Sequence, residues 1–421
     1  MTQTASTGVI LPEMHRRAFL FASLAALADP PRAPVELALP VTRSGDPGFD
    51  AWAQAFLPRA LAGGVPEAVA RRELAGLTPD ERIVAADRSQ PELSRPISDY
   101  VQRAVSEAKV EAGRARFGDM RSWLGRIEAR SGVPGEILVG IWGMESDYGA
   151  IQGDRDIVRS LATLAYEGRR RDWAETQLIA ALRILADGRI GRERLRGSWA
   201  GAMGQTQFIP ATYLDTAVDI DGDGRRDIWA SAPDALGSAA NLLAKAGWAR
   251  GQSWAREVRL PSGFDYGLSE GPRYGLLQWM SLGARAADGR PWRDADNEAE
   301  AQLILPAGAR GPAFLAFGNH FVIRAYNNST AYALAVGLLA DRVAGRPGVV
   351  TSWPYEAPIP LSDRKGAQLA LNRLGYDVGE PDGVIGTKTR AAVRAWQKAS
   401  GLTPDGHLTP DLAQRLQAQG S

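Results

Sequence analysis

The stretch from Val133 to Gly149, VPGEILVGIWGMESDYG, constrains the fold of this chain more than any other. Its proline suits the first turn of a helix, where the missing N–H costs nothing, and its final glycine suits the helix end. Ile137, Ile141 and Glu145 follow one another at four-residue spacing, which places a carboxylate on the apolar face of the predicted helix. Two glycines within the stretch allow another backbone, or a ligand, to approach closely.

A carboxylate on an apolar helix face is costly while it is charged. Removal from water raises the pKa of such a group, so that Glu145 can hold a proton at neutral pH and act as a general acid. The alternative is a structural role, in which Glu145 lies at a helix end and pairs with an arginine from elsewhere in the chain. The spacing leaves both interpretations open, because perturbed carboxylates only tend to be functional.

The composition limits the class of protein. At 421 residues the chain is long enough for two or three domains. Its formal net charge of +1 provides no strong field to attract nucleic acid or anionic lipid. Cysteine is absent, which excludes disulfides, thiol nucleophiles, zinc–thiolate sites and lipidation at an N-terminal cysteine. Twelve tryptophans are many for this length, and we expect core packing for most of them rather than flat platforms for sugars.

Residues 1–28 have the pattern of an export signal. Arg16 and Arg17 precede an apolar run over 18–27, and an Ala-Leu-Ala cleavage pattern follows. The run is too short to span a bilayer as a stable anchor. The two arginines followed by Phe-Leu also resemble a twin-arginine signal. We therefore expect an exported protein that is not a lipoprotein and that has no transmembrane anchor after signal cleavage.

Apolar residues recur at helical spacing through most of the chain after the signal. The predicted helices cover 49–62, 66–75, 99–117, 120–131, 161–165 and 173–187, in addition to the Glu145 helix. Strand signals are scarce, and only Glu257–Leu260 and Gln302–Leu305 suggest short strands. We therefore predict an α+β fold, mostly α, for a main domain over 45–350.

A proline-rich linker over 351–361 separates a smaller unit from the main domain. This unit, over 362–416, contains two Pro-Asp-Gly turns, each followed by a threonine and a helical pattern, which suggests an internal pseudo-repeat. It contains no catalytic constellation. We therefore expect a binding module built from short helices.

Residues 219–227, DIDGDGRRD, have the pattern of a calcium loop. Carboxylates at alternate positions match positions 1, 3 and 5 of an EF-hand loop, and the glycines allow the chain to wrap a hard cation. Ala230 stands where such a loop has a bidentate glutamate, so we expect a later carboxylate to close a longer loop over 219–234. The expected Ca²⁺ ligands are Asp219, Asp221, Asp223, the carbonyl of Arg225, and Asp234. The alternative is an Asp/Gly-rich turn without metal.

The remaining residues favour carboxylate-based catalysis. Histidine occurs three times and no G-x-S-x-G is present, so a Ser-His-Asp triad would depend on His320 alone. There is also no H-E-x-x-H and no P-loop. A two-carboxylate glycosidase would pair Glu145 with Asp147, but a residue two positions further along a helix points away. We interpret Asp147 as the residue that ends the helix.

Five separate motifs occur along the chain in a distinctive order. They are GIWGMESDYGAIQG (140–153), GSWAGAMGQTQFIPATY (197–213), DIDGDGRRDIW (219–229), DALGSAANLLAKAGW (234–248) and AYNNSTAYALAV (325–336). Together they resemble the lytic murein transglycosylase B family over roughly residues 47–345. The tail, with LNRLGY, PDGVIGTKTRAAVRAWQ and GLTPDG, resembles the type 1 peptidoglycan-binding domain, a small three-helix module.

The resemblance implies a lysozyme-like catalytic domain that acts on the glycan strands of peptidoglycan in the periplasm. The family cleaves the β-1,4 bond between N-acetylmuramic acid (MurNAc) and N-acetylglucosamine (GlcNAc) without water. One glutamate, matched here by Glu145, first donates a proton to the leaving glycosidic oxygen. It then removes a proton from the C6 hydroxyl of MurNAc, which attacks C1 and closes a 1,6-anhydro ring. The resemblance also implies an oxazolinium-like intermediate made by the substrate's own N-acetyl group, so that no protein nucleophile is needed.

Other positions carry over from the family one by one. The residues that match the lining of the sugar sites are Ser198 and Gln207 near the glutamate, and Tyr326, Asn327 and Tyr332 on the opposite wall. Within the run Arg169–Arg171, Arg169 and Arg170 match a paired arginine that reaches toward the substrate. The family's calcium loop matches at the five expected ligands. Leu242 departs from the pattern, because some members have a substrate-stacking tyrosine there.

Two other functions stay open at this level. One is a muramidase of the same fold, which admits water and leaves reducing ends. The other is a peptidoglycan-binding protein without catalytic activity. The intact motif around Glu145 favours the lytic transglycosylase, with peptidoglycan glycan strands as its partner, no nucleic acid partner, and Ca²⁺ as a structural ion.

Overall fold

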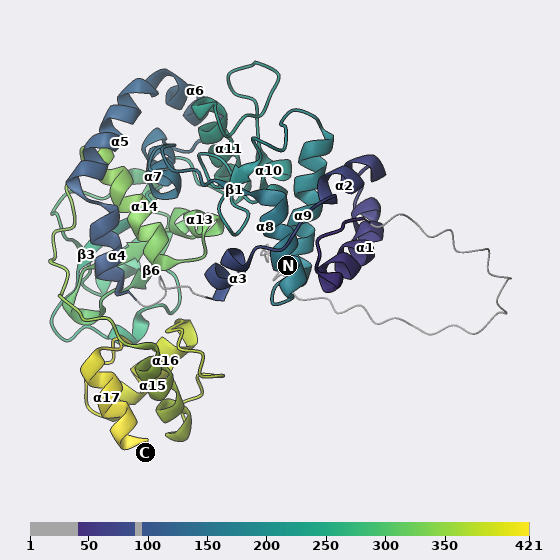
Figure 1. Ribbon diagram of the computed structural model, residues 1–421. Coiled ribbons are helices and arrows are strands. Elements are labelled where there is room, and N and C mark those ends of the chain that lie inside the picture. Colours follow the sequence, from purple (N-terminus) through teal and green to yellow (C-terminus); the bar gives the residue numbers. More distant parts are fainter. Residues whose placement is uncertain (1–40, 89–94, 421) are drawn as a thin grey trace, which may run out of the picture. The chain divides into compact units, whose positions relative to one another are not determined.

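The computed structural model describes residues 41–88 and 95–420, which are mostly helical (Figure 1). The predicted export signal over 1–28 lies outside the described residues. Within the described ranges, no helix is both long and apolar enough to cross a membrane.

The elements follow one another in this order. The helices before the sheet are α1 (Pro47–Ala62), α2 (Glu67–Leu74), α3 (Glu81–Arg88), α4 (Ile97–Ala104), α5 (Glu107–Asp119), α6 (Arg121–Ser131), α7 (Gly135–Ser146), α8 (Ile157–Glu167), α9 (Arg171–Ala186), α10 (Pro210–Thr216) and α11 (Ala232–Lys245). The later helices are α12 (Leu276–Ser281), α13 (Gly318–Tyr326), α14 (Thr330–Val343), α15 (Leu361–Arg373), α16 (Thr387–Ala399) and α17 (Pro410–Gln419). The strands are β1 (Arg155–Asp156), β2 (Arg196–Gly197), β3 (Ala255–Arg259), β4 (Tyr274–Gly275), β5 (Arg285–Ala286), β6 (Glu300–Ile304) and β7 (Ala313–Ala316).

The predicted fold class, mostly α with a small sheet, is confirmed, but one predicted helix was wrong. The stretch 99–117 forms two helices, α4 and α5, rather than one. Ser106 breaks the stretch, since its side chain accepts a hydrogen bond from the N–H of Lys109 and caps a new helix. The apolar spacing continues across this point, but the serine cap starts a second helix.

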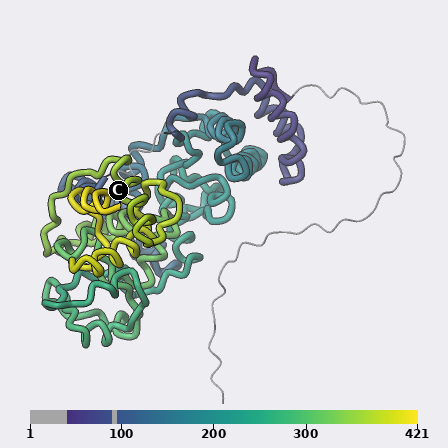
Figure 2. The backbone as a smooth tube through the Cα atoms, turned by 90° about the horizontal axis from the view of Figure 1, so that it is seen from below, coloured from purple at the N-terminus to yellow at the C-terminus, as the bar shows by residue number. Residues whose placement is uncertain are grey.

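The first helical core forms around α1, α8 and α9, which lie close together in both views (Figures 1 and 2). Trp52 and Phe56 of α1 stack with ring centroids 5.4 Å apart. Phe49 meets Tyr166 of α8 edge to face at 5.3 Å. Burial of these large rings anchors the N-terminal helices to the rest of the domain.

Helix α7 is the centre of the second helical core, and nine of its twelve residues are buried. It packs against α14, α5, α6 and α11. At Gly140 an added Cβ would lie 2.8 Å from the carbonyl oxygen of Val336, so the predicted close approach of another backbone is confirmed. The helix ends at Ser146, three residues before the predicted end at Gly149, because Asp147 adopts a left-handed conformation. The interpretation of Asp147 as the terminating residue is confirmed.

A five-stranded antiparallel sheet forms a third core, in the order β4-β6-β7-β3-β5. The two strands expected from the sequence correspond to β3 and β6, which both pair with β7. Trp279 of α12 is fully buried under this sheet and donates from its indole N–H to the carbonyl of Ala301 at 2.9 Å. The sheet therefore has a compact core of its own beside α13 and α14.

The C-terminal module consists of α15, α16 and α17 around a fourth core. Its predicted pseudo-repeat is visible in two matched hydrogen-bond patterns. Gln368 donates to Asp382 and accepts from the N–H of Gly383 at 2.6 Å. Gln397 donates to Asp405 and accepts from the N–H of Gly406 at 2.7 Å. In each half, a glutamine on a helix fixes a Pro-Asp-Gly turn.

The predicted linker contains no helix or strand over 351–360, but it is bound to the sheet. The N–H groups of Val350 and Thr351 donate to the carboxylate of Glu257 at 2.6 and 2.8 Å. The ring of Trp353 lies 6.5 Å from that of Phe314 in β7. The start of the segment is therefore held against the sheet, whereas Tyr355 further along is 96% exposed.

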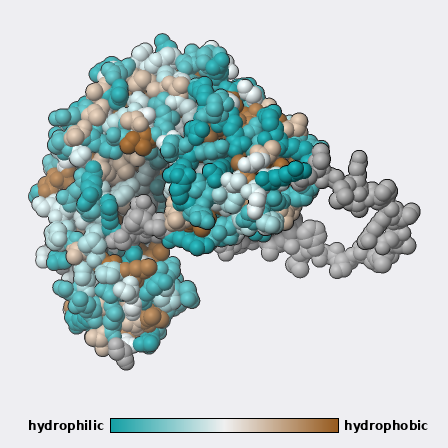
Figure 3. Space-filling model, viewed as in Figure 1, coloured by the Kyte–Doolittle hydropathy of each residue, from teal (hydrophilic) through white to brown (hydrophobic). Residues whose placement is uncertain are grey.

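All twelve tryptophans lie in the described part of the chain, and none of them is exposed. Six are buried: Trp52, Trp142, Trp248, Trp254, Trp279 and Trp396. Five more are partly buried and pack against the cores, namely Trp173, Trp199, Trp229, Trp292 and Trp353. The expectation that most tryptophans serve packing is therefore confirmed. Hydrophobic residues form only separate patches on the face shown in Figure 3.

Candidate active site

Glu145 lies in the last turn of α7, where its residue surface is half-buried. Its Oε1 accepts a hydrogen bond from the hydroxyl of Tyr332 in α14 at 2.5 Å. Burial raises the pKa of Glu145 to about 7, and the hydrogen bond from Tyr332 opposes that rise without cancelling it. A pKa in this range allows the group to donate and to accept a proton at neutral pH. Among the described residues no cation influences it, so the ion pair with an arginine is not what the structure contains.

A second tyrosine supports the first. Tyr326 of α13 stacks on Tyr332 with ring centroids 6.4 Å apart and planes at 17°. Its hydroxyl donates to the carbonyl of Thr206 at 2.5 Å. The two rings therefore connect the Glu145 carboxylate to the 197–208 loop, and the deep burial of both hydroxyls raises their pKa values, so both stay neutral donors.

Ser146 fixes the backbone directly after Glu145. Its Oγ donates to the carbonyl of Gln205 at 2.5 Å and accepts from the N–H of Gly149 at 2.9 Å. Ser146 is 2 % exposed, so water competes little for these bonds. The end of α7 is thus attached to the 197–208 loop on one side of Glu145.

Ser198 and Gln207 lie at the two ends of that loop. The backbone N–H of Ser198 donates to Ala202, and its Oγ accepts from the N–H of Ala202 at 3.0 Å. Gln207 has a positive φ of 50°, and its side-chain amide donates to the carbonyls of Gln152 at 3.0 Å and Gly204 at 2.8 Å. Both side chains therefore shape the loop.

Arg169 and Arg170 both pair with Asp87, the buried residue before the end of α3. Arg169 donates to Asp87 Oδ2 at 2.6 Å, and a nitrogen of Arg170 lies 2.7 Å from Oδ1. The two guanidinium groups hold the pKa of Asp87 below its ordinary value although burial opposes this. The Arg170 guanidinium also lies over the rings of Trp173 and Trp199, at 4.8 and 5.6 Å from their centroids. Trp199 follows Ser198 directly, which places Arg170 beside the 197–208 loop.

Asn327 and Leu242, which were also named from the resemblance, lie outside these hydrogen-bond networks. Asn327 is exposed at the C-terminal end of α13, one residue after Tyr326. Leu242 of α11 is partly buried and packs against both helical cores. A leucine at this position therefore serves packing in this chain.

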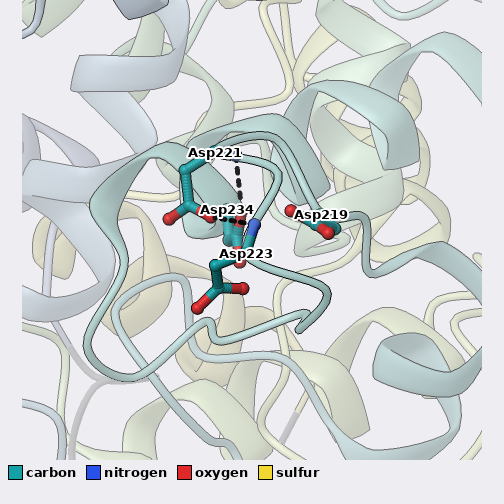
Figure 4. A group of neighbouring side chains, drawn as sticks. All are labelled: Asp219, Asp221, Asp223 and Asp234. Carbon is teal, nitrogen blue, oxygen red and sulfur yellow. Dashed lines mark hydrogen bonds between the residues drawn. The ribbon is translucent and has the colours of Figure 1, made fainter.

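The four aspartates of the predicted calcium loop converge (Figure 4). Oxygens of Asp219, Asp221, Asp223 and Asp234 all lie within 4.8 Å of one another. Asp234 is fully buried in the first turn of α11 and accepts from the N–H groups of Ile220 at 2.7 Å and Asp227 at 2.9 Å.

The donor set of this loop fits a hard cation. All the converging side-chain atoms are carboxylate oxygens, which is the ligand type that calcium prefers. Gly222 and Gly224, at φ of 83° and 84°, allow the tight turns that bring alternate aspartates to one side. The cluster could therefore hold a metal ion, and the buried Asp234 lies within it.

Sequence reasoning missed several residues of this region. No local pattern around Asp87 signals that it pairs with two arginines more than eighty residues later. The direct contact between Tyr332 and Glu145 was also not expected, since the resemblance placed Tyr332 only on a substrate wall. A tyrosine on an otherwise apolar helix, such as Tyr332, could have suggested a buried hydrogen bond. It could not have identified Glu145 as the acceptor.

The mostly helical main domain, with its small sheet and a glutamate at the end of a buried helix, has a lysozyme-like fold. The chain belongs to the family described as the transglycosylase SLT domain, whose family model matches residues 48–341. A second family model, described as a putative peptidoglycan binding domain, matches residues 361–416.

Individual relatives agree with this family. The membrane-bound lytic murein transglycosylase B of Escherichia coli strain K12 is 33% identical over 254 residues, which cover 58% of this chain and 66% of that protein. The crystal structure of SltB3 from Pseudomonas aeruginosa in complex with NAG-anhNAM-pentapeptide is 48% identical with a TM-score of 0.84, covering 88% of this chain and all of that one. The structure of the Escherichia coli lytic transglycosylase Slt35 in complex with calcium is 28% identical with a TM-score of 0.61, covering 74% and 98%.

Proposed function

We propose that the protein is a lytic transglycosylase that cleaves the MurNAc-β-1,4-GlcNAc bond of peptidoglycan, with Glu145 as acid and then as base. The observation that carries this proposal is a single buried carboxyl, bonded to Tyr332 and with a pKa raised to about 7. A group that must first donate and later accept a proton works best with a pKa near the ambient pH. Asp147 offers no second carboxylate here, since it is exposed and lies 3.3 Å from Lys109 Nζ.

The reaction then consists of two proton transfers through one residue. In the first, protonated Glu145 gives its proton to the glycosidic oxygen, the C1–O bond breaks, and the carbonyl oxygen of the substrate's N-acetyl group bonds to C1. In the second, the Glu145 carboxylate takes the proton of the C6 hydroxyl, O6 attacks C1, and the bond from C1 to the acetyl oxygen breaks. Glu145 regains its proton, a 1,6-anhydro-MurNAc end forms, and no water is consumed.

The surrounding residues have roles that fit this sequence. Tyr332 stabilises the Glu145 carboxylate between the two transfers through its hydroxyl. We propose that Ser198, Gln207, Tyr326 and Asn327 line the sugar sites. Arg169 and Arg170 are proposed to contact the substrate while Asp87 holds them. Arg170, stacked on Trp173 and Trp199, presents a flat cationic surface that suits an acidic group of the substrate.

The aspartate loop is proposed to bind Ca²⁺ as a structural ion. Asp219, Asp221, Asp223, Asp234 and the carbonyl of Arg225 would hold it, and the ion would supply charge neutralisation for the clustered carboxylates. The calcium complex of Slt35 supports this assignment. None of the proton transfers passes through the ion.

We also propose the cellular setting and the domain division. The export signal over 1–28 would deliver a periplasmic protein, and the absence of cysteine from the sequence supports a form without a lipid anchor. The catalytic domain would cover 45–350, the linker 351–361 and the peptidoglycan-binding module 362–416. The family match over 361–416 supports a role of this module in holding the enzyme on its polymeric substrate.

Product analysis tests the proposal. Mass spectrometry of peptidoglycan digested by the purified protein is expected to reveal fragments that lack one water relative to hydrolysis products. Fragments with reducing ends would indicate a hydrolytic muramidase of the same fold. The Glu145→Gln variant is expected to release neither, and release at the wild-type rate would show that another residue catalyses the reaction.

A further inference from the structure

Lys109 of α5 reaches the end of α7 from the side. Its Nζ donates to the carbonyl of Gly143 at 2.8 Å and lies 3.3 Å from Oδ1 of Asp147. These two residues stand two positions before and two positions after Glu145. The Lys109 side chain is 23% exposed, so both contacts are only partly screened by water.

Tyr148, which follows the end of α7, makes a second contact with Lys109. Its hydroxyl donates to the carbonyl of Lys109 at 2.7 Å. Its ring fills the space between α5 and α7, because an added Cβ at Gly113 or at Gly143 would lie 2.7 Å from atoms of this tyrosine. We call these contacts, made by Lys109, Gly143, Asp147 and Tyr148, the α5–α7 clasp.

The clasp holds a turn that the backbone does not favour. Asp147 and Tyr148 have φ values of 50° and 60°, and two consecutive non-glycine residues in the left-handed region are costly. Such a turn persists only where its surroundings impose it. Lys109 and Tyr148 connect the turn to α5, whereas Ser146 connects it to the 197–208 loop. The turn is therefore fixed from two different elements.

We propose that Lys109 is a positioning residue for Glu145, which holds the last turn of α7 in place by bridging the Gly143 carbonyl and the Asp147 carboxylate. This inference rests on the proposed catalytic role of Glu145. Lys109 does not touch the reacting atoms. It acts through the backbone on both sides of Glu145, so that the carboxyl stays at the hydroxyl of Tyr332 and out of water.

Two roles of a lysine near a glutamate can be separated by the direction of a pKa change. If Lys109 acted only through its charge, its removal would raise the pKa of Glu145, because a nearby cation favours the carboxylate. If it positions the turn, its removal loosens the end of α7, lets water reach the carboxyl, and lowers a pKa that burial had raised. A residue that only stabilises the fold would change neither the pKa nor the turnover of the folded enzyme.

The test is the steady-state kinetics of the full-length protein on soluble glycan fragments, as a function of pH. For Lys109→Met we expect kcat to fall about tenfold or more, since small misplacements of catalytic groups are costly, with KM changed by less than about threefold. The alkaline limb of the pH–rate profile is expected to move to lower pH. Lys109→Arg keeps a donor and a charge and should recover most of the loss. Arg116→Met, on the same helix and paired with Asp119 rather than with the end of α7, is the matched control and should keep wild-type kinetics.

Tyr148→Phe provides a second variant in case Lys109→Met does not fold. It removes the hydrogen bond to the Lys109 carbonyl and keeps the ring between the glycines. We therefore expect kcat to fall by about threefold to tenfold, and the alkaline limb of the pH–rate profile to move to lower pH, as in Lys109→Met. Wild-type kcat and pH profile in both variants would overturn the inference, as would an alkaline limb that moves to higher pH in Lys109→Met. Full activity of Glu145→Gln, measured alongside, would instead overturn the proposed function.

Discussion

Glu145 and the aspartate loop over 219–234 place the same chemical group in opposite surroundings. Glu145 is one carboxyl, bonded to one neutral tyrosine hydroxyl, and burial raises its pKa to about 7. The loop gathers four carboxylates within 4.8 Å, and two of them, Asp221 and Asp223, are exposed. A lone carboxyl in protein can exchange a proton at neutral pH, whereas a cluster of carboxylates near water invites a cation.

The comparison teaches that the number of carboxylates and their access to water decide what each region can do. Asp87 is a third case that supports this view. Asp87 is 3% exposed, yet two arginines hold its pKa below the ordinary value, so it serves structure rather than proton transfer. Burial alone therefore does not mark a catalytic acid, and the absence of a cationic partner is the additional requirement.

The largest expected effect is the loss of glycan cleavage when Glu145 is replaced, since the aspartate loop is not expected to take part in catalysis. Glu145→Gln removes the only group proposed to move protons, and we expect the rate of glycan cleavage to fall by about a thousandfold or more. Glu136→Gln is the matched control on the same helix, since Glu136 pairs with Arg346 and should leave the rate unchanged. If Glu145→Gln kept more than a tenth of the wild-type rate, Glu145 would not be the catalytic carboxyl.

The next effect is on stability, and its sign follows from the raised pKa. The folded protein prefers Glu145 protonated, so stability is unaffected below the ordinary pKa of 4.5 and is lost as pH rises to about 7. Glu145→Gln cannot ionise and avoids this loss. Urea unfolding should give equal stabilities near pH 4 and a variant more stable by up to about 3 kcal/mol at pH 8. A difference that does not change with pH would contradict the raised pKa.

Calcium should raise the stability of the folded protein by binding to the aspartate loop over 219–234. Binding to the folded state alone adds about 2.7 kcal/mol at a calcium concentration one hundred times Kd, so the melting temperature of chelator-treated protein should rise on addition of Ca²⁺. Asp221→Asn together with Asp223→Asn should abolish the rise. Asp215→Asn, an exposed aspartate paired with Lys245, should keep it. No rise in the wild-type protein would remove the metal assignment and leave an Asp/Gly-rich turn.

The smallest effect concerns the hydroxyl that touches Glu145. Tyr332→Phe removes a hydrogen bond that lowers the pKa of Glu145, so the alkaline limb of the pH–rate profile should move to higher pH while kcat falls about tenfold. Tyr326→Phe, whose hydroxyl bonds to Thr206 instead, should leave the limb in place. Equal shifts in both variants would mean that the pair acts through packing rather than through the bond to Glu145.

Short-range patterns accounted for the parts of this molecule that depend on neighbouring residues. The four-residue spacing around Glu145 predicted its helix and its apolar face, because helical periodicity is local. Alternate aspartates and glycines predicted the cluster at 219–234 for the same reason. The two Pro-Asp-Gly turns predicted a repeat that the glutamine hydrogen bonds of α15 and α16 now explain.

Long-range contacts could not be predicted in this way. Tyr332 meets Glu145 across 187 positions, and only the family resemblance brought it near the site. Asp87 lies 82 positions before Arg169, so the spacing of the arginines could not reveal that they are paired rather than free. Gly149 suggested a later end of α7, because glycine is the usual C-terminal residue. The helix instead ends before Asp147, as the interpretation of that residue predicted, since α5 and the 197–208 loop impose its left-handed conformation.

The pH dependence of kcat/KM on soluble glycan fragments tests the central claim most directly, because it reports the pKa of the essential group in the free enzyme. If Glu145 is a buried carboxyl without a cationic partner, activity should decline above an apparent pKa of about 7. A decline that already sets in near the ordinary pKa of 4.5 of a hydrated glutamate, or full activity that persists well above pH 7, would contradict it.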